Sequence, residues 1–331
     1  MLFLLLGPGI FPMSINKFSN LFPLFKEHLG DEVFFNAPLA PHVAYRVGGP
    51  ADILVFLSTE ESLQWVDATA KKYQIPITII GTGTNLLVVD EGIRGITLSL
   101  AKAFQKIEEV PGAPEGCVWI RCGGGVLKPE LLEWAVQKGY AGLEFSSGVP
   151  GTMGGGIYMN AGTKYGCYGD ILKELRLFDF TKGTQQLKRD ALHFAYRESE
   201  VKNALVIWAL FELRHGNSQV IRAEVDRIIE ERAEKQPLDY PSCGSTFKNG
   251  PGYSSGRLIE KAGLKGLTVG GAEISTKHAN FILNKGTATA KDILTLIDII
   301  KVRIKDQFGI SLECEVCVLG GENDRKIPTK T

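Results

Sequence analysis

Three glycine-rich segments limit what this chain can fold into more than any other feature of its sequence. Gly48 and Gly49 adjoin in one, residues 81–86 read GTGTNL, and residues 146–162 read SSGVPGTMGGGIYMNAG, with six glycines. Glycine loses more conformational freedom on folding than any other residue, so three such segments need a compensating purpose. Their successive backbone N–H groups can face an anion without side chains in the way. We therefore expect the three segments to cradle a diphosphate from both sides.

The segment at 81–86 follows an expected strand, as a dinucleotide-binding fingerprint would. It lacks the third glycine, however, and the residues around it continue as LLVVD, which is typical of a strand rather than a helix. The Rossmann arrangement needs a helix N-terminus at this point, so it is excluded, and no phosphate-loop lysine motif occurs. A plain hairpin turn remains the alternative for this segment taken alone.

Length and charge favour a small-molecule ligand. The 331 residues are 44% hydrophobic, which indicates a soluble globular protein of two or three domains. Lys+Arg and Asp+Glu both count 37, without a long run of one sign, so we expect neither nucleic acid nor membrane as a partner.

The six cysteines lack the spacing of a secreted disulfide framework, which predicts reduced thiols in a cytoplasmic protein. Cys314 and Cys317 form the one C-x-x-C pair. In a strand, residues three apart point to opposite faces, so we expect no metal site there.

The first residues form an apolar run that breaks at Gly7 and lacks the basic start and cleavage site of a signal peptide. The run is also much shorter than the roughly 20 apolar residues of a transmembrane helix. We expect residues 1–17 to be a disordered extension, or to include a start codon assigned too early, with Met13 as the true beginning.

Hydrophobic periodicity predicts helices and strands that mix without strict alternation, which is typical of an α+β protein. A β-α-β unit opens the fold, the helix at 218–237 is expected to cross into another domain, and residues 321–331 are expected to fray. Helices are expected at 18–29, 61–74, 128–139, 218–237, 254–263 and 290–309. Strands are expected at 42–47, 50–58, 75–81, 84–92, 95–100, 105–110, 117–125, 172–180, 204–216, near 273–275 and 280–284, and at 311–320.

Seven sequence blocks match one enzyme family in order and spacing. They read YRVGGPAD, GTGTNLLV, GLEFSSGVPGTMGGGIYMNAG, AYRESE, CGSTFKN, RLIEKAGLKGLTVGGAEISTKHANFILN and LECEV. From about Pro41 to Gly320 the sequence resembles the UDP-N-acetylenolpyruvoylglucosamine reductases, flavoenzymes of bacterial cell-wall (peptidoglycan) precursor synthesis. The resemblance implies an FAD-binding fold of the vanillyl-alcohol-oxidase type, followed by an α+β substrate-binding domain.

The domain limits follow from this resemblance. The FAD-binding region is expected at 18–218, with subdomains at about 18–80 and 81–218, and the substrate-binding domain at 219–320.

The resemblance also implies a reaction. NADPH, the co-substrate, reduces non-covalently bound FAD, and UDP-N-acetylenolpyruvoylglucosamine then takes the hydride and becomes UDP-N-acetylmuramate. The two substrates use one shared site in turn, which explains why no separate nicotinamide-dinucleotide fingerprint is found. We expect a monomer.

Cofactor contacts are assigned by the resemblance to the three glycine segments. They are Gly48, Gly49, Gly81, Thr82, Gly83, Thr84, Asn85, Leu86, Ser147, Gly148, Val149, Pro150, Gly151, Gly154, Gly155, Ile157 and Asn160. Substrate contacts are expected from Tyr196, Lys248 and Asn249. Three further cations, Arg257, Lys261 and Lys277, are unranked candidates for the substrate phosphates.

Reduction of an enolpyruvyl double bond needs a hydride at one carbon, a proton at the other, and cations or acids near the carboxylate. The resemblance implies that Arg197 binds the carboxylate, that Ser245 donates the proton, and that Glu315 orients the enolate or relays its proton. Lys248 serves either the proton of Ser245 or a substrate phosphate.

The expected last strand, LECEVCV, divides its side chains between two faces. Glu313, Glu315 and Cys317 share one face, with Glu313 as a solvated neighbour of Glu315. Four residues are expected to face the core: Leu312, Cys314, Val316 and Val318.

The chain also departs from the family pattern. Thr84 stands where serine is usual, Gly250 where proline is usual and Cys317 where arginine is usual. The loop at 162–170 is lengthened, which is expected to alter FAD contacts near Tyr168. The short 199–245 segment matches the branch without a substrate-covering tyrosine loop.

Two other functions remain open. One is a flavin oxidase of the same fold, for which His42 or Cys167 is the nearest candidate for covalent flavin attachment. The other is a flavin- or nucleotide-sugar-binding module without catalysis.

Overall fold

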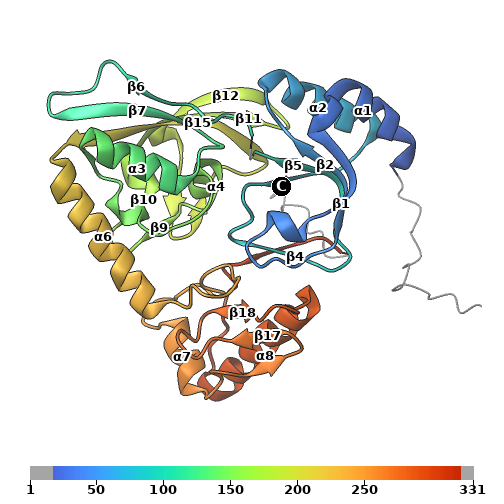
Figure 1. Cartoon of the computed structure of the whole chain (residues 1–331), viewed down its shortest axis with the longest axis vertical. Helices are drawn as coiled ribbons and strands as arrows, with labels where there is room; N and C mark the ends of the chain where they lie inside the picture. Colours follow the sequence, from blue (N-terminus) through green and yellow to red (C-terminus); the bar gives the residue numbers. More distant parts are fainter. Residues whose placement is uncertain (1–17, 101, 322–331) are drawn as a thin grey trace, which may run out of the picture.

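The structure is a computed structural model that describes residues 18–100 and 102–321. The expectations for residues 1–17, and for 322–331 at the end of the tail, lie outside the described residues. Figure 1 shows three lobes, with the N-terminal one in blue, the middle one in green and yellow, and the C-terminal one in orange and red. The helix expected at 218–237 is α6 (Ser218–Lys235), which runs from the middle lobe to the C-terminal lobe (Figure 1).

The N-terminal lobe is a four-stranded sheet with two helices. Its elements are α1 (Phe22–Leu29), β1 (Val33–Pro38), β2 (Pro50–Phe56), α2 (Glu60–Tyr73), β3 (Ile77–Ile80) and β5 (Ile93–Ser99). The strand order is β1-β2-β5-β3, in which β1 is antiparallel to β2 while β2 and β3 run parallel to β5. The predicted β-α-β unit is therefore confirmed. The expected subdomain boundary near residue 80 falls inside this sheet, because β5 follows β3 in the chain.

Helix α2 forms because its sequence supplies both a cap and an apolar face. The Thr59 hydroxyl accepts a hydrogen bond from the Ser62 amide at 3.1 Å, and acidic residues in the first turn suit the helix dipole. Leu63, Val66 and Ala70 are buried against the apolar residues of the sheet. This spacing of three and four residues is the signal that predicted the helix.

The prediction of a strand at 42–47 is wrong. Val43, Tyr45 and Val47 are buried in alternation, as in a strand, but Arg46 has a φ of 54° and the backbone turns there. The hairpin partner of β2 is instead β1. Every second side chain is buried here, as in a strand, although the backbone is irregular, and this pattern led to the wrong prediction.

The middle lobe is built on an antiparallel sheet with the order β12-β11-β15-β7-β6, to which β8 adds by pairing with β15. Its strands are β6 (Ile107–Val110), β7 (Cys117–Gly123), β8 (Tyr140–Ala141), β11 (Leu172–Asp179), β12 (Gly183–Lys188) and β15 (Ala204–His215). Its helices besides α6 are α3 (Lys128–Lys138), α4 (Met153–Tyr158) and α5 (Tyr168–Ile171). Smaller elements are β9 (Gly162–Thr163), β10 (Gly166–Cys167), β13 (Phe194–Ala195) and β14 (Glu198–Ser199).

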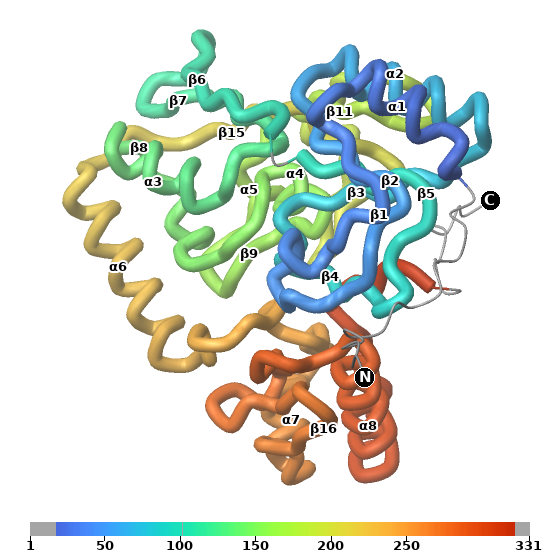
Figure 2. The backbone as a smooth tube through the Cα atoms, turned by 45° about the vertical axis from the view of Figure 1, so that its right-hand side comes forward, coloured from blue at the N-terminus to red at the C-terminus, as the bar shows by residue number. Residues whose placement is uncertain are grey.

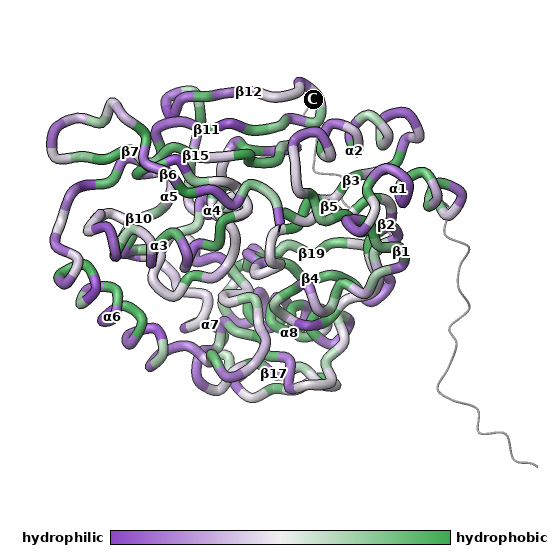
Figure 3. Tube along the Cα trace, turned by 45° about the horizontal axis from the view of Figure 1, so that its top comes forward, coloured by the Kyte–Doolittle hydropathy of each residue, from purple (hydrophilic) through white to green (hydrophobic). Residues whose placement is uncertain are grey.

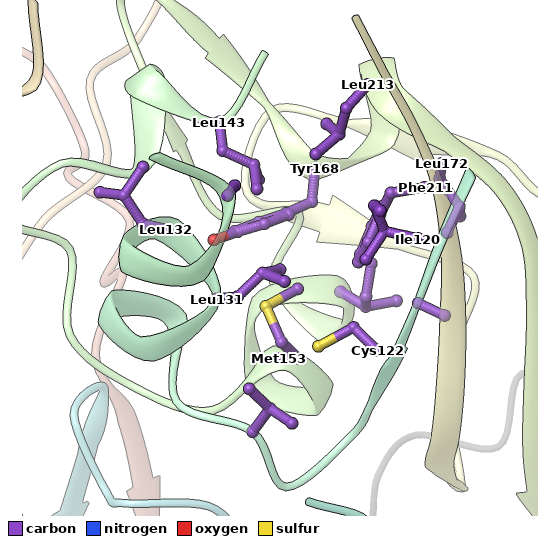
Figure 4. Close-up of a cluster of buried hydrophobic side chains, with 14 of the residues drawn as sticks. Ile120, Cys122, Leu131, Leu132, Leu143, Met153, Tyr168, Leu172, Phe211 and Leu213 are labelled. Atoms are coloured by element: carbon purple, nitrogen blue, oxygen red, sulfur yellow. The ribbon is translucent and has the colours of Figure 1, made fainter. Parts of the chain in front are cut away.

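Figure 4 shows the buried core of this lobe, in which Leu131 of α3 and Met153 of α4 lie toward side chains of the sheet, while Leu132 of α3 lies farther from the sheet. Tyr168 lies within this cluster, and its hydroxyl is 2.5 Å from the Ser146 hydroxyl. Tyr168 is therefore a core residue beside the lengthened loop. Strand β12, at the edge of the sheet, is mainly hydrophilic in Figure 3, as expected for a strand that does not lie in the core.

The segment predicted as a continuous glycine loop contains helix α4, which is a correction to the expectation. Thr152 accepts a hydrogen bond from the Gly155 amide at 3.3 Å and caps the helix, while Met153 and Ile157 are buried. Three successive glycines give a poor helix propensity. Capping and burial outweigh that propensity here, because both come from tertiary structure that periodicity over six residues cannot reveal.

The C-terminal lobe consists of a three-stranded sheet and two helices. Its elements are α7 (Ser255–Lys261), β16 (Thr268–Val269), β17 (Ala272–Ile274), β18 (Ile282–Asn284) and α8 (Ala290–Phe308). Figure 2 shows α7, β16 and α8 together below the other two lobes. After α8 the chain returns to the N-terminal lobe, where β19 (Cys317–Leu319) pairs in parallel with β4 (Leu86–Val88). The short 3₁₀ helices are Ser19–Leu21, Gly30–Glu32, Ala40–His42, Glu144–Ser146 and Arg189–Ala191.

The last strand is shorter than the expected 311–320, because regular pairing is confined to β19. Leu312 and Val316 are buried and Glu313 is exposed, as the alternation predicted. Val318, expected to face the core, is exposed instead. Strand β19 pairs only with β4 in a two-stranded sheet of the described residues. So small a sheet does not bury one whole face of the strand, and the expected alternation of buried and exposed side chains fails there.

Candidate active site

A cavity of about 900 Å³ is lined by residues from all three lobes. The N-terminal lobe contributes the GTGTNL segment before β4, and the middle lobe contributes the loop that leads into α4. The C-terminal part contributes Ser245 and, near β19, Glu315. Sequence segments more than 200 residues apart therefore meet at one place, as Asn85 shows by donating from Nδ2 to the Glu315 carbonyl oxygen at 2.9 Å.

Two of the three glycine segments line this cavity. The predicted cofactor residues found in its wall are Gly81, Thr82, Gly83, Thr84, Asn85, Leu86, Val149, Pro150, Gly151, Gly154 and Gly155. The two segments touch closely, since a Cβ atom at Gly81 would lie only 2.5 Å from the Thr152 hydroxyl oxygen. Glycine at 81 is thus required by the approach of the two segments.

Six predicted cofactor residues do not line the cavity. They are Gly48, Gly49, Ser147, Gly148, Ile157 and Asn160. Gly49 is explained by backbone packing, because a Cβ atom there would lie 2.1 Å from the Asp90 carbonyl oxygen. The Gly-Gly segment therefore serves a close approach between two parts of the N-terminal lobe.

Three of these side chains are buried or hydrogen-bonded within the middle lobe. Ile157 is fully buried in its core, and the Ser147 hydroxyl donates to the Glu144 carbonyl oxygen at 2.7 Å. The Asn160 amide donates to the Ala195 carbonyl oxygen at 2.9 Å and accepts from the Gly169 amide at 3.0 Å. Burial gives Ile157 a structural role, and these hydrogen bonds do the same for Ser147 and Asn160.

The cavity wall carries polar groups that lack partners. The Thr82 hydroxyl oxygen is buried and has no hydrogen-bond partner within the described part of the chain. Lys128, the first residue of α3, also lines the cavity, and it is only 5% exposed. A buried hydroxyl and a buried ammonium beside glycine-rich backbone fit a phosphate-bearing cofactor such as FAD.

Arg197 and Glu315 form an ion pair in the same cavity. The distance from Arg197 Nε to Glu315 Oε1 is 2.6 Å, and both side chains are mostly buried. Burial raises the pKa of the Glu315 carboxyl above its usual range, although the nearby Arg197 guanidinium acts in the opposite direction. The backbone of Arg197 has a φ of 57° in the tight turn between β13 and β14, and its guanidinium lies over the Tyr196 ring.

The CGSTFKN segment lies beside the chain that carries Glu315. The Glu315 amide donates to the Thr246 carbonyl oxygen at 2.8 Å, and the Lys248 amide donates to the Glu313 carbonyl oxygen at 2.9 Å. Ser245 and Glu315 therefore enter the cavity from adjacent segments. The φ of 73° at Gly244 explains why glycine precedes this serine.

Asn280 holds the CGSTFKN segment from the other side. Its side chain accepts from the Phe247 amide at 3.0 Å and donates to the Phe247 carbonyl oxygen at 2.8 Å. Asn280 is buried, so both bonds are shielded from water. This asparagine lies in one of the matching sequence blocks but had no predicted role, because a bond across 33 residues has no local signal.

The three expected substrate residues lie outside the cavity wall. Lys248 pairs with Glu313 at 2.5 Å, and Glu313 is also solvated, as predicted, because its side chain is 71% exposed. Asn249 accepts from the Ser255 amide at 3.0 Å, and Tyr196 is 53% exposed.

Other expected ligand contacts are also absent from the wall that the described residues form. Arg257, Lys261 and Lys277 do not line the cavity, and the Lys277 ammonium donates to the Ala233 carbonyl oxygen at 2.6 Å. The candidates for covalent flavin attachment, His42 and Cys167, are likewise absent from it.

Three cations in the cavity wall had no predicted role. They are Lys71, Lys128 and Arg232, which come from α2, α3 and α6, and Lys71 is paired with Asp67. Lys128 had a detectable signal, because a lysine at the start of an expected helix opposes the helix dipole. Arg232 had none, since its helix carries many other charged residues.

Among the described residues, no helix combines the length and the apolar character that crossing a membrane requires.

Comparisons with known proteins agree with this arrangement. A family model described as FAD binding domain matches residues 51–187, and one described as UDP-N-acetylenolpyruvoylglucosamine reductase, C-terminal domain, matches residues 236–319. The predictions of an α+β fold and of an FAD-binding first half are thereby confirmed.

Proteins named UDP-N-acetylenolpyruvoylglucosamine reductase are similar over most of their length. The one from Moorella thermoacetica is 41% identical over 290 residues, which cover 87% of this chain and 94% of the relative. The one from Clostridioides difficile is 42% identical over 295 residues, covering 88% and 94%. The crystal structure of UDP-N-acetylenolpyruvylglucosamine reductase from Thermus caldophilus matches with a TM-score of 0.73 and 34% identity, covering 87% of this chain and 98% of that one. The chain therefore belongs to the UDP-N-acetylenolpyruvoylglucosamine reductase family.

Proposed function

We propose that the protein is an FAD-dependent oxidoreductase that reduces UDP-N-acetylenolpyruvoylglucosamine to UDP-N-acetylmuramate with NADPH, in peptidoglycan precursor synthesis. The observation that carries this proposal is the meeting of Ser245, Arg197 and Glu315 in one cavity with the glycine-rich segments. A hydroxyl, a guanidinium and a carboxyl are the groups that reduction of an enolpyruvyl ether requires.

The two glycine segments that line the cavity would hold the FAD. Backbone N–H groups of the GTGTNL segment and of the loop before α4 would face the diphosphate, and the unpartnered Thr82 hydroxyl would bond to it. When bound and reduced, the FAD supplies the hydride for the enolpyruvyl group.

Arg197 would bind the substrate carboxylate and stabilise the negative charge that spreads onto it during the reaction. A guanidinium is suited to this role because it makes two parallel hydrogen bonds to a carboxylate. Its Nε is held by Glu315, which leaves the terminal nitrogens for the substrate. The tight turn between β13 and β14 fixes the direction from which the side chain enters.

Ser245 would donate the proton at the second carbon of the double bond. A hydroxyl is a weak acid, but a carbanion is a strong base, and nearby cations stabilise the alkoxide that remains. Glu315 would orient Arg197 and the enolate. Its raised pKa also suits a group that relays a proton.

Lys248 has a narrower role in this proposal than the sequence suggested. Its ammonium forms an ion pair with Glu313, so in this arrangement its positive charge influences the site from a distance. Lys248 binds a substrate phosphate only if that ion pair breaks. Tyr196 and Asn249 likewise belong to the proposed substrate contacts only if the substrate extends beyond the cavity. The shared site for both substrates, the monomeric state and the cytoplasmic location complete the proposal.

Steady-state turnover tests this function against its alternatives. The flavin-loaded protein should oxidise NADPH in the absence of oxygen only when the enolpyruvyl nucleotide sugar is present. Hydrogen peroxide formed from a sugar or alcohol would instead support the oxidase. No turnover with any of these substrates, with flavin bound, would support a binding module.

Denaturation tests the cofactor linkage separately. Flavin should be released intact from the unfolded protein, because neither His42 nor Cys167 lines the cavity. Flavin that remains attached to the unfolded chain would contradict non-covalent binding.

A further inference from the structure

Lys128 occupies a position that disfavours a positive charge in two ways. It is the first residue of α3, where the positive end of the helix dipole repels a cation. It is also only 5% exposed, so its ammonium has lost most of its hydration. A lysine held there requires a compensating interaction.

The protein itself does not supply that interaction. Within residues 18–100 and 102–321, no carboxylate forms an ion pair with the Lys128 ammonium. Its charged neighbours are the guanidinium groups of Arg197 and Arg232, and with burial as the larger cause they lower the pKa of Lys128 to about 8. Arg197 is paired with Glu315, whereas Lys128 and Arg232 add uncompensated positive charge to the cavity.

The ammonium lies where the two glycine segments meet. A Cβ atom at Gly151 would be 3.1 Å from Lys128 Nζ and 2.8 Å from the Thr84 hydroxyl oxygen. The stem of Lys128 passes Gly156, where an added Cβ would lie 3.2 Å from Lys128 Cδ. Glycine at 151 and 156 therefore leaves the space that the lysine side chain uses.

The backbone fixes this meeting point. The Lys128 amide donates to the Gly151 carbonyl oxygen at 2.8 Å, and the Met153 amide donates to the Val126 carbonyl oxygen at 2.8 Å. These bonds join the start of α3 to the loop before α4, so the backbone of Lys128 is held beside the glycine segments.

We propose that Lys128 binds the diphosphate of FAD and neutralises part of its charge. This inference rests on the proposed binding of FAD in the cavity. A diphosphate is the anionic part of that cofactor, and an anion beside the first turn of α3 is favoured by the same dipole that disfavours the lysine. Lys128 thereby adds a side-chain cation beside the backbone amides and hydroxyls of the glycine segments.

Titration of Lys128 makes the binding of FAD dependent on pH. A bound anion favours the charged ammonium, so binding raises the pKa of Lys128 above about 8, its value in the free protein. FAD affinity should be constant below that pH and should fall as the free protein loses the proton. The groups that face Lys128 are Arg197 from the turn after β13, Arg232 from α6 and, at its stem, Tyr168 from α5. The two guanidiniums remain charged throughout this range.

The test is a titration of the apo protein with FAD, followed by flavin fluorescence. Lys128→Met should raise the dissociation constant about ten- to a hundredfold, as expected for loss of a charge-assisted hydrogen bond. Lys128→Arg should restore most of the affinity. Lys138→Met, in the last turn of the same helix and paired with Glu109 outside the cavity, should have no effect.

Titrations of the wild type at pH 7 to 10 give a second measurement that does not depend on how a variant folds. The wild-type dissociation constant should rise above pH 8, and that of Lys128→Arg should stay constant. A flat wild-type profile would overturn the proposal, as would equal affinities of wild type and a folded Lys128→Met.

The flavin reduction potential separates the two ends of the cofactor. It should be the same in FAD-loaded wild type and Lys128→Met. A shifted potential would place the ammonium at the flavin ring and contradict diphosphate binding. Failure of the wild type to bind FAD would instead contradict the proposed function.

Discussion

Arg197 Nε and Glu315 Oε1 lie 2.6 Å apart, although 118 residues separate the two positions in the chain. The pair joins the turn after β13 in the middle lobe to the segment before β19, beside the CGSTFKN segment. It holds a guanidinium in a cavity that also contains Lys128 and Arg232, two cations without a carboxylate ion-pair partner among the described residues.

Replacing Arg197 should impair the reduction of the enolpyruvyl group. Arg197→Lys keeps the charge but loses the planar fork that binds a carboxylate with two bonds. The rate of the second half-reaction should fall about a hundredfold, comparable to the loss of one donor from an oxyanion site. Rapid mixing of reduced enzyme with substrate measures it, and a rate equal to wild type would exclude Arg197 from charge stabilisation. Arg189→Lys is the control, since this arginine bonds backbone carbonyls outside the cavity.

The raised pKa of Glu315 predicts a pH-dependent difference in stability between wild type and Glu315→Gln. A carboxyl whose pKa is higher in the folded chain stabilises the fold below its unfolded pKa, and this contribution is lost as pH rises through the folded value. Glutamine does not titrate. The free energy of unfolding of Glu315→Gln, minus that of the wild type, should therefore be larger at pH 7 than at pH 4. Denaturant unfolding of the apo proteins measures it, and a difference that does not change with pH would contradict the assignment.

Asn280 should be necessary for the position of Ser245. Asn280→Ala removes two buried hydrogen bonds to the backbone of Phe247, so it should reduce the free energy of unfolding by about 1–3 kcal/mol. The same variant should slow the second half-reaction while FAD affinity stays near that of wild type. Loss of stability with an unchanged rate would show that the CGSTFKN segment is held without this clamp.

Asp90 joins the N-terminal lobe to the start of α8. Its carboxylate accepts from the amides of Ala290 at 2.9 Å and Lys291 at 3.0 Å, which are otherwise free at a helix start. Asp90→Ala should cost about 1 kcal/mol of unfolding free energy, as for loss of a helix cap. Glu91→Ala is the matched control, because only the backbone oxygen of Glu91 bonds to Arg94. Equal thermal midpoints for the two variants would show that the cap contributes nothing.

The sequence predicted the elements whose periodicity is long and unbroken. The β2-α2-β3 unit and α8 are examples, because their apolar faces repeat over several turns. It did not predict α4, whose glycines oppose a helix until Thr152 caps it and Ile157 is buried. Strand β1 was missed because its pairing with β2 defines it more than its own short sequence.

The candidate site shows the same division between local signals and tertiary contacts. Ser245, Arg197 and Glu315 could be identified from short motifs, and the structure places them in one cavity. Asn160 carried a motif as well, but its amide is used for backbone bonds inside the middle lobe. Lys128 lay outside the matching blocks. Its role could not be predicted, because it depends on contacts with a loop that follows more than twenty residues later.

The two half-reactions of Ser245→Ala separate the reduction of the flavin from the protonation of the substrate. Rapid mixing without oxygen follows flavin absorbance, first as NADPH reduces the bound FAD and then as the enolpyruvyl nucleotide sugar oxidises it. Ser254→Ala is the control, because Ser254 precedes α7 without making a side-chain cap bond and lies outside the cavity. We predict that Ser245→Ala reduces its flavin at nearly the wild-type rate but loses the second step by several orders of magnitude, while Ser254→Ala performs both. Equal loss of both steps, or a second step at the wild-type rate, would contradict Ser245 as the proton donor.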